Sequence, residues 1–131
     1  MIKFNEISMV NGRALVRQLN DEEENKLASG IVLPGKKTNE FKNLAVVLSV
    51  GGKYLHSSGI EYDFPAYPGD LILMRDGFGI EPLRINGEDF KVLEPQAVVA
   101  VLTNRGNTLS ATETSITVED SEGNTIVTIG E

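Results

Sequence analysis

The sequence predicts a small all-β domain. Among 131 residues there are 12 valines, 10 isoleucines and 8 threonines, and these β-branched residues favour strands. Helical periodicity with a capping signal is hard to find, whereas short apolar runs bounded by Gly, Pro, Asn or Asp are frequent. We expect seven main strands, at Arg13–Leu19, Leu44–Val50, Leu71–Met74, Phe90–Leu93, Ala97–Leu102, Ser115–Glu119 and Thr125–Ile129.

Two of these strands are almost continuously apolar. Neither Leu44–Leu48 nor Val98–Leu102 alternates with polar residues, so both of their faces should be covered, as in a small closed barrel or at a subunit contact. A hairpin is predicted between Leu83–Ile85 and Phe90–Val92, because the intervening Asn86-Gly87 suits a type I′ turn. Short strands joined by tight turns therefore indicate a compact barrel.

Composition argues against several classes of function. With 12 basic and 19 acidic residues the net charge is −7, which repels nucleic acid and anionic membranes. There is no cysteine and one histidine, His56, which is too few ligands for a typical metal centre. His56 lies next to serines, but no spacing suggests an orienting acid or an oxyanion hole. We therefore expect a soluble cytoplasmic protein that is not an enzyme, with no catalytic residue and no metal.

Two stretches lie outside the predicted barrel. Residues 21–40 begin with four acidic residues and form a long polar stretch, and loops beyond about 12–15 residues are usually functional or disordered. Residues 104–131 hold five acidic residues and one arginine, hence −4 of the total charge of −7. We expect this extension to form an acidic β-hairpin that is dispensable for folding, because the barrel pattern already closes at Leu102.

An apolar triplet, Ile31-Val32-Leu33, stands in the middle of the first of these stretches, between Gly30 and Pro34. One interpretation is an edge strand packed on the core. The other is a recognition segment that becomes extended on binding and inserts its aliphatic side chains into a groove of a partner. Spacing alone leaves both interpretations open.

These motifs, in this order, resemble the GroES-like co-chaperonins, the lids of GroEL-type chaperonins. The likeness covers about residues 9–103. It is carried by five segments: Asn11-Gly12-Arg13-Ala14-Leu15-Val16-Arg17, Lys26–Pro34, Val46–Lys53, Pro68–Met74 with Asp76–Gly79, and Val98–Leu102.

The resemblance implies a GroES-like barrel at residues 1–103, with a mobile loop at about 21–40 and a roof hairpin at about 52–64. It implies that Gly30, Ile31, Val32 and Leu33 bind the chaperonin, which itself uses ATP, so that this chain needs no cofactor. It also implies a homo-oligomer, a ring of seven that encloses a client protein, with Ile7–Leu19 of one copy beside Val98–Leu102 of the next. Phe78 would face the client, although an ordinary core position is equally compatible with its sequence context.

The sequence also departs from the family pattern. Met9-Val10-Asn11-Gly12 replaces the usual Pro-Leu-x-Asp, and the resemblance gives no role to residues 104–131. Such divergence would suit a bacteriophage-encoded lid. An alternative is an oligomeric structural β-module of a virion or phage tail, in which the last 28 residues are functional and Ile31–Leu33 packs in the core. A zinc-binding, alcohol-dehydrogenase-type GroES-like domain is opposed by the lack of cysteine.

Overall fold

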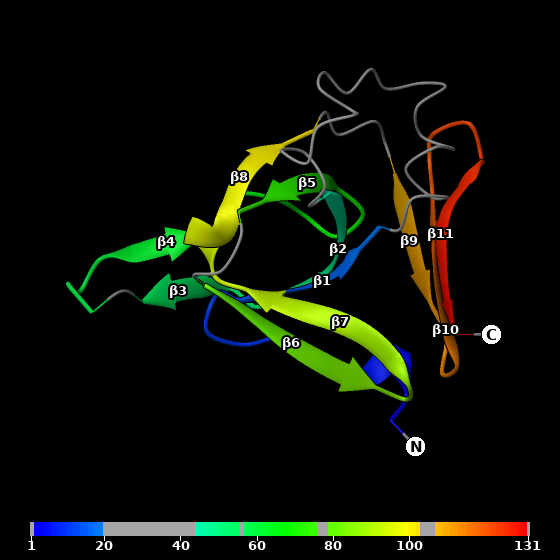
Figure 1. Ribbon diagram of the computed structural model, residues 1–131, viewed down its shortest axis with the longest axis horizontal. Helices are drawn as coiled ribbons and strands as arrows, with labels where there is room; N and C mark the ends of the chain where they lie inside the picture. The colour runs from blue at the N-terminus through cyan, green and yellow to red at the C-terminus, as the bar shows by residue number, and fades with distance from the viewer. Residues whose placement is uncertain (1, 20–43, 56, 76–78, 103–106, 131) are drawn as a thin grey trace.

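The computed structural model describes residues 2–19, 44–55, 57–75, 79–102 and 107–130, which contain eleven β-strands and two short 3-10 helices (Figure 1). The helices are η1 (Phe4–Glu6) and η2 (Pro95–Ala97). The strands are β1 (Ala14–Gln18), β2 (Leu44–Val50), β3 (Lys53–Leu55), β4 (Glu61–Asp63), β5 (Leu71–Met74), β6 (Ile80–Ile85), β7 (Glu88–Leu93), β8 (Val98–Val101), β9 (Thr108–Ala111), β10 (Ser115–Glu119) and β11 (Thr125–Gly130). The predicted all-β class is confirmed.

Six strands form the barrel sheet, in the order β6-β7-β1-β2-β5-β8. Every neighbouring pair is antiparallel. β1 pairs with both β2 and β7, whereas β6 and β8 are the two edge strands of this sheet. Figure 1 shows the six strands curled around a common centre, with the β3–β4 hairpin projecting to one side and the sheet of β9, β10 and β11 on the other.

The Asn86-Gly87 turn joins β6 to β7 as predicted. Asn86 has φ 53° and Gly87 has φ 83°, the left-handed conformations that a type I′ turn requires at both central positions. Asn tolerates this region better than most residues, and Gly has no Cβ to oppose it. The turn fixes the register of the hairpin, in which Ile85 pairs with Glu88.

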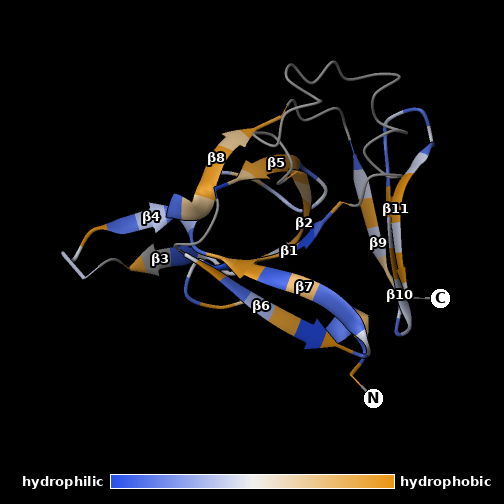
Figure 2. Cartoon of the chain, in the orientation of Figure 1, coloured by the Kyte–Doolittle hydropathy of each residue, from blue (hydrophilic) through white to orange (hydrophobic). Residues whose placement is uncertain are grey.

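Both faces of the central strands are buried, as their continuous apolar sequence predicts (Figure 2). Because side chains alternate along a strand, Leu44, Val46 and Leu48 join one apolar cluster and Ala45 and Val47 join another. The buried members of the second cluster all lie between Ala14 and Ala97 in the sequence, and many of them have small side chains. The first is larger, and we call it the major cluster.

The C-terminal part of the chain completes the major cluster. It contributes five buried side chains, those of Ile116, Val118, Ile126, Val127 and Ile129. These come from a sheet of three strands, in the order β11-β10-β9, which we call the C-terminal sheet. β10 and β11 occupy the expected hairpin positions, but β9 was not expected. Since the sheet shares a core with the barrel, the structure argues against the expectation that it is dispensable.

Candidate functional site

The predicted chaperonin-binding residues, Gly30, Ile31, Val32 and Leu33, lie outside the described residues. The structure does place Leu19 and Leu44, the described residues on either side of residues 20–43, in which these four residues lie. Leu19 donates its backbone N–H to the carbonyl oxygen of Leu44, at 2.9 Å, and both side chains are buried in the major cluster. Leu19 and Leu44 therefore form a hydrogen-bonded and buried stem on either side of residues 20–43.

Phe78 also lies outside the described residues, as does His56. Around Phe78, the backbone N–H of Arg75 donates to the carbonyl oxygen of Ala97 at 2.9 Å, and that of Glu94 donates to Gly79 at 2.9 Å. Both ends of the short segment are therefore held next to η2. The choice between a cavity-facing and a core position for Phe78 stays a prediction.

The edge strand β8 presents apolar side chains to solvent. Val99 and Val101 are 61% and 41% exposed, whereas the alternate residues Val98 and Ala100 are half-buried. Among the described residues, β8 pairs only with β5, so the backbone groups of its other edge have no strand partner there. An edge of this kind invites pairing with another chain.

Residues 7–10 have the alternation of a strand but belong to none. Ile7 and Met9 pack partly buried on the major cluster, whereas Ser8 and Val10 are exposed, Val10 by 64%. In the sequence, only the apolar alternation of Ile7 and Met9 could have revealed this segment on its own. We call residues Ile7–Val10 the N-terminal segment.

The subunit contact expected over Ile7–Leu19 must therefore be shorter. Residues 14–18 form β1, which pairs with β2 along its whole length and with β7 on its other edge at residues 14–16. Backbone groups used within one chain cannot also bind a second copy. Within the expected range, residues 7–13 and 19 belong to no strand, and of these the N-terminal segment has the alternating burial of a strand.

The β3–β4 hairpin carries a further group of exposed apolar side chains. Leu55, Ile60 and Tyr62 are 64%, 54% and 45% exposed. An ion pair at 3.2 Å between Lys53 Nζ and Asp63 Oδ1 closes the base of the hairpin. The hairpin therefore holds solvent-facing apolar groups away from the barrel, which is typical of a contact surface.

A cavity of about 250 Å³ lies beside β6 and β7, and Arg13 and Glu94, which form an ion pair at 3.6 Å, both line it. Its remaining lining residues are Gly79, Ile80, Glu81 and Val92, with no Ser, Thr, Lys or His among them. Within the described ranges, no group of three or more His, Cys, Asp or Glu is placed to hold a metal ion. No helix in that part of the chain has the length and hydropathy to cross a membrane.

Comparison with known proteins gives one consistent result. The family model of the chaperonin 10 Kd subunit matches residues 6–102, which include the whole six-stranded barrel sheet and the β3–β4 hairpin. The match ends before the C-terminal sheet, which begins at Thr108.

Curated relatives cover the same part of the chain. The co-chaperonin GroES of Chromohalobacter salexigens is 36% identical over 95 residues, which are 72% of this chain and 96% of that protein. The GroES proteins of Shewanella denitrificans and Haemophilus influenzae are 30% and 26% identical over 96 residues, 73% of this chain and 97% of each relative. These relatives give no support to the alternative of a virion or tail module.

Proposed function

We propose that this chain, which belongs to the chaperonin 10 Kd subunit family and is a co-chaperonin, closes the folding chamber of a GroEL-type chaperonin. The observation that carries this proposal is the family match across residues 6–102. ATP would be bound and hydrolysed by the chaperonin, and this chain would act without catalysis or a cofactor of its own. The site of action would be the cytoplasm.

Gly30, Ile31, Val32 and Leu33 would make the contact with the chaperonin. Two features support this assignment: the apolar triplet stands within a long polar stretch, and Leu19 and Leu44, on either side of residues 20–43, are hydrogen-bonded to each other. A stem of this kind fixes the root of the segment without using the triplet. Alternate aliphatic side chains can then enter an apolar groove of the partner.

The functional form would be a homo-oligomer, and we assign it a ring of seven as the family resemblance implies. The β8 edge of one copy, with exposed Val99 and Val101, would pair with the N-terminal segment of the next. Each loop on its own would bind weakly, since ordering its backbone costs about 1–2 kcal/mol per residue and only three side chains are buried. Linking several loops in one ring can raise avidity by about 10²–10⁴.

The space enclosed by the ring would hold a client protein. Phe78 would face that space, between the flanking residues that are tied to η2. The exposed apolar side chains of the β3–β4 hairpin fit a place at the roof of such an assembly.

The double variant Ile31→Asp with Leu33→Asp tests the docking assignment. Each substitution puts an unpaired carboxylate into an apolar groove, which costs several kcal/mol per site even after relaxation. We expect an unchanged thermal melt and the loss of capped complexes when the protein, a GroEL-type chaperonin and nucleotide are viewed by negative-stain microscopy. A matched control, Ala28→Asp with Asn39→Asp, adds the same charge to the same stretch and should still cap.

The opposite pattern would contradict the assignment. If the triplet is an edge strand of the core, the double variant buries two charges and its thermal midpoint falls by many degrees. Capping by the double variant at the level of the control would also exclude the triplet as the contact.

A further inference from the structure

The N-terminal segment has the alternating burial of a strand at a place where it has no strand to pair with. Ile7 and Met9 face the major cluster while Ser8 and Val10 face solvent. The described residues give the segment no ladder pairing, and Ile7 itself donates its N–H back to Phe4 within η1. Something other than sheet pairing must therefore hold the segment in place.

One anchor lies before the segment, at η1, and it is built by the C-terminal sheet, through its β9–β10 turn and the end of β11. Phe4 is 5% exposed, and its backbone N–H donates to the carbonyl oxygen of Glu113 at 3.1 Å. The Lys3 ammonium lies 3.5 Å from the Glu113 carboxylate. A Cβ added to Gly130 would stand 3.0 Å from the ring of Phe4, so the end of β11 packs closely on the same ring.

The barrel supports this anchor from the other side. The rings of Phe4 and Phe90 meet edge to face, with centroids 6.1 Å apart. Ile2 and Asn86 exchange two hydrogen bonds, from the Ile2 N–H to Oδ1 and from Nδ2 to the Ile2 carbonyl oxygen. Phe4 is therefore enclosed between β7 and the C-terminal sheet.

A second anchor lies after the segment. Gly12 donates its N–H to the carbonyl oxygen of Gly51 at 2.8 Å, and Gly51 donates back to Arg13 at 2.9 Å. The backbone of Met9 and Val10 passes so close to Gly51 that a Cβ there would stand 2.4 Å from the carbonyl carbon of Met9. The N-terminal segment thus lies between two anchors.

We infer that the C-terminal sheet is an assembly clamp: by holding Phe4 and Lys3 it fixes the position of the N-terminal segment, so that this segment is ready to pair with β8 of a second copy. The inference rests on the subunit contact proposed above and adds to it the role of a part of the chain that the family match does not cover. A segment ordered in advance loses less conformational freedom on association, and this preorganisation raises affinity without any new contact.

Charge also suits this arrangement. The C-terminal part of the chain is acidic, and the Lys3 ammonium lies 3.5 Å from the Glu113 carboxylate and 3.9 Å from that of Glu6. Reversal of either partner therefore turns an attraction into a repulsion at the anchor, while the paired reversal restores opposite charges. This permits a test that leaves the buried core untouched.

The first test is Phe4→Ala in the full chain, with the assembly measured by sedimentation velocity over a dilution series. We expect the protein concentration at half-assembly to rise at least tenfold. Ile126→Ala is the matched control, because Ile126 is equally buried at 6% in the same cluster but lies at the far end of β11 from Gly130. The control should lower the thermal midpoint and move half-assembly by less than threefold.

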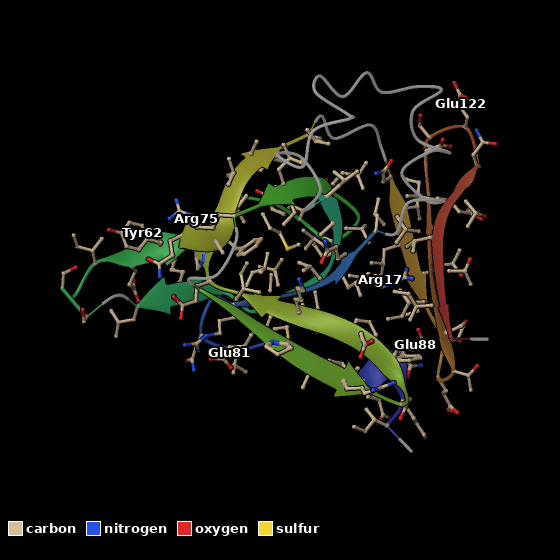
Figure 3. The ribbon with its side chains drawn as sticks, in the orientation of Figure 1. Arg17, Tyr62, Arg75, Glu81, Glu88 and Glu122 are labelled. Atoms are coloured by element: carbon tan, nitrogen blue, oxygen red, sulfur yellow. The ribbon has the colours of Figure 1, made fainter. Side chains whose placement is uncertain are left out.

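The second test uses Lys3→Glu, Glu113→Lys and the combination of both. Each single change should raise the half-assembly concentration about threefold or more, and the double change should recover most of the loss. Glu122→Lys is the charge-matched control, since Glu122 lies in the β10–β11 turn, at the end of the sheet away from η1 (Figure 3). If Phe4→Ala does not fold, the charge-reversal variants alone test the clamp.

A third variant separates failure of the clamp from failure of the subunit contact. Val101→Asp places a charge on the β8 edge and should dissociate the assembly. If Val101→Asp dissociates it while Phe4→Ala and the charge reversals assemble as the wild type does, the clamp is wrong and the contact stands. If Val101→Asp also leaves assembly unchanged, the proposed contact itself is wrong.

Discussion

Gly51 shows how a single residue without a side chain can position a neighbouring segment. The backbone atoms around it belong to Met9 and Val10, and backbone cannot rotate aside as a flexible side chain can. We expect Gly51→Ala to lower the free energy of unfolding by about 3 kcal/mol, the upper end of the usual cost of overpacking. Gly52→Ala is the control, because Gly52 faces open space and has only a φ of 78° to oppose a side chain, worth about 1–2 kcal/mol. Equal losses in urea unfolding would contradict this interpretation.

Asp120 gives the β10–β11 turn a dependence on pH. The backbone N–H groups of Asn124 and Glu122 each donate to its Oδ1 at 2.9 Å, and the Asn124 bond is the main reason that the pKa of Asp120 is lowered. Because the folded pKa is depressed, the carboxylate supports the turn above the unfolded pKa, and this support is lost as pH falls through the folded pKa.

The measurement is an NMR titration of the Asn124 amide. Its midpoint should lie below that of an Asp in an unstructured peptide in the same buffer, and Asp120→Asn should abolish the transition. A midpoint at or above the peptide value would show that the turn does not hold the carboxylate.

At the scale of elements, the C-terminal sheet is an integral part of the core. Truncation after Leu102 removes five buried aliphatic side chains, each worth about 1.5–3 kcal/mol, against a total stability of about 5–15 kcal/mol for a typical domain. We expect the truncated chain to lose its cooperative thermal melt when followed by circular dichroism. A cooperative melt near that of the full chain would instead restore the original expectation that the extension is dispensable.

The elements that the sequence did not predict are those with little burial. β9 is mostly exposed, so no apolar pattern marked Thr108–Ala111 as a strand. β6 was expected only in its last three residues, because Glu81 and Pro82 are exposed and proline is tolerated only at a sheet edge. The central strands, in contrast, were predicted within a few residues, since burial on both faces leaves a continuous apolar run.

The candidate site was predicted by a different kind of reasoning. The prediction that Gly30–Leu33 bind a chaperonin came from the resemblance to a family. The local sequence pattern alone was compatible with both a core strand and a contact segment. The N-terminal segment was found within a longer expected range, and its true extent depends on β1 having both edges paired. Pairing across a sheet is set by residues far apart in sequence, which local periodicity does not reveal.

For the whole molecule, the proposed ring, which would bind through several weak loops, should respond steeply to the loss of a few of them. We expect mixed assemblies of wild type and the Ile31→Asp, Leu33→Asp variant to lose capping faster than the fraction of wild-type loops falls, because each lost contact lowers the avidity multiplicatively. The number of capped complexes, counted by negative-stain microscopy across mixing ratios, measures this. Mixing wild type with the control variant Ala28→Asp, Asn39→Asp should leave the number of capped complexes unchanged. A linear decline of that number with the fraction of Ile31→Asp, Leu33→Asp chains would show that the loops act independently.

The shared core also constrains how the protein is made. Leu15 is packed in one cluster with Ile116, and at about 5–20 residues per second the ribosome adds the second roughly 5–20 seconds after the first. Throughout that interval the major cluster lacks the five buried side chains of the C-terminal sheet, and Leu71, Ile85 and Phe90 cover it only in part. Folding must therefore finish after translation of β11, and the nascent lid is itself an aggregation-prone chain until its last strands emerge.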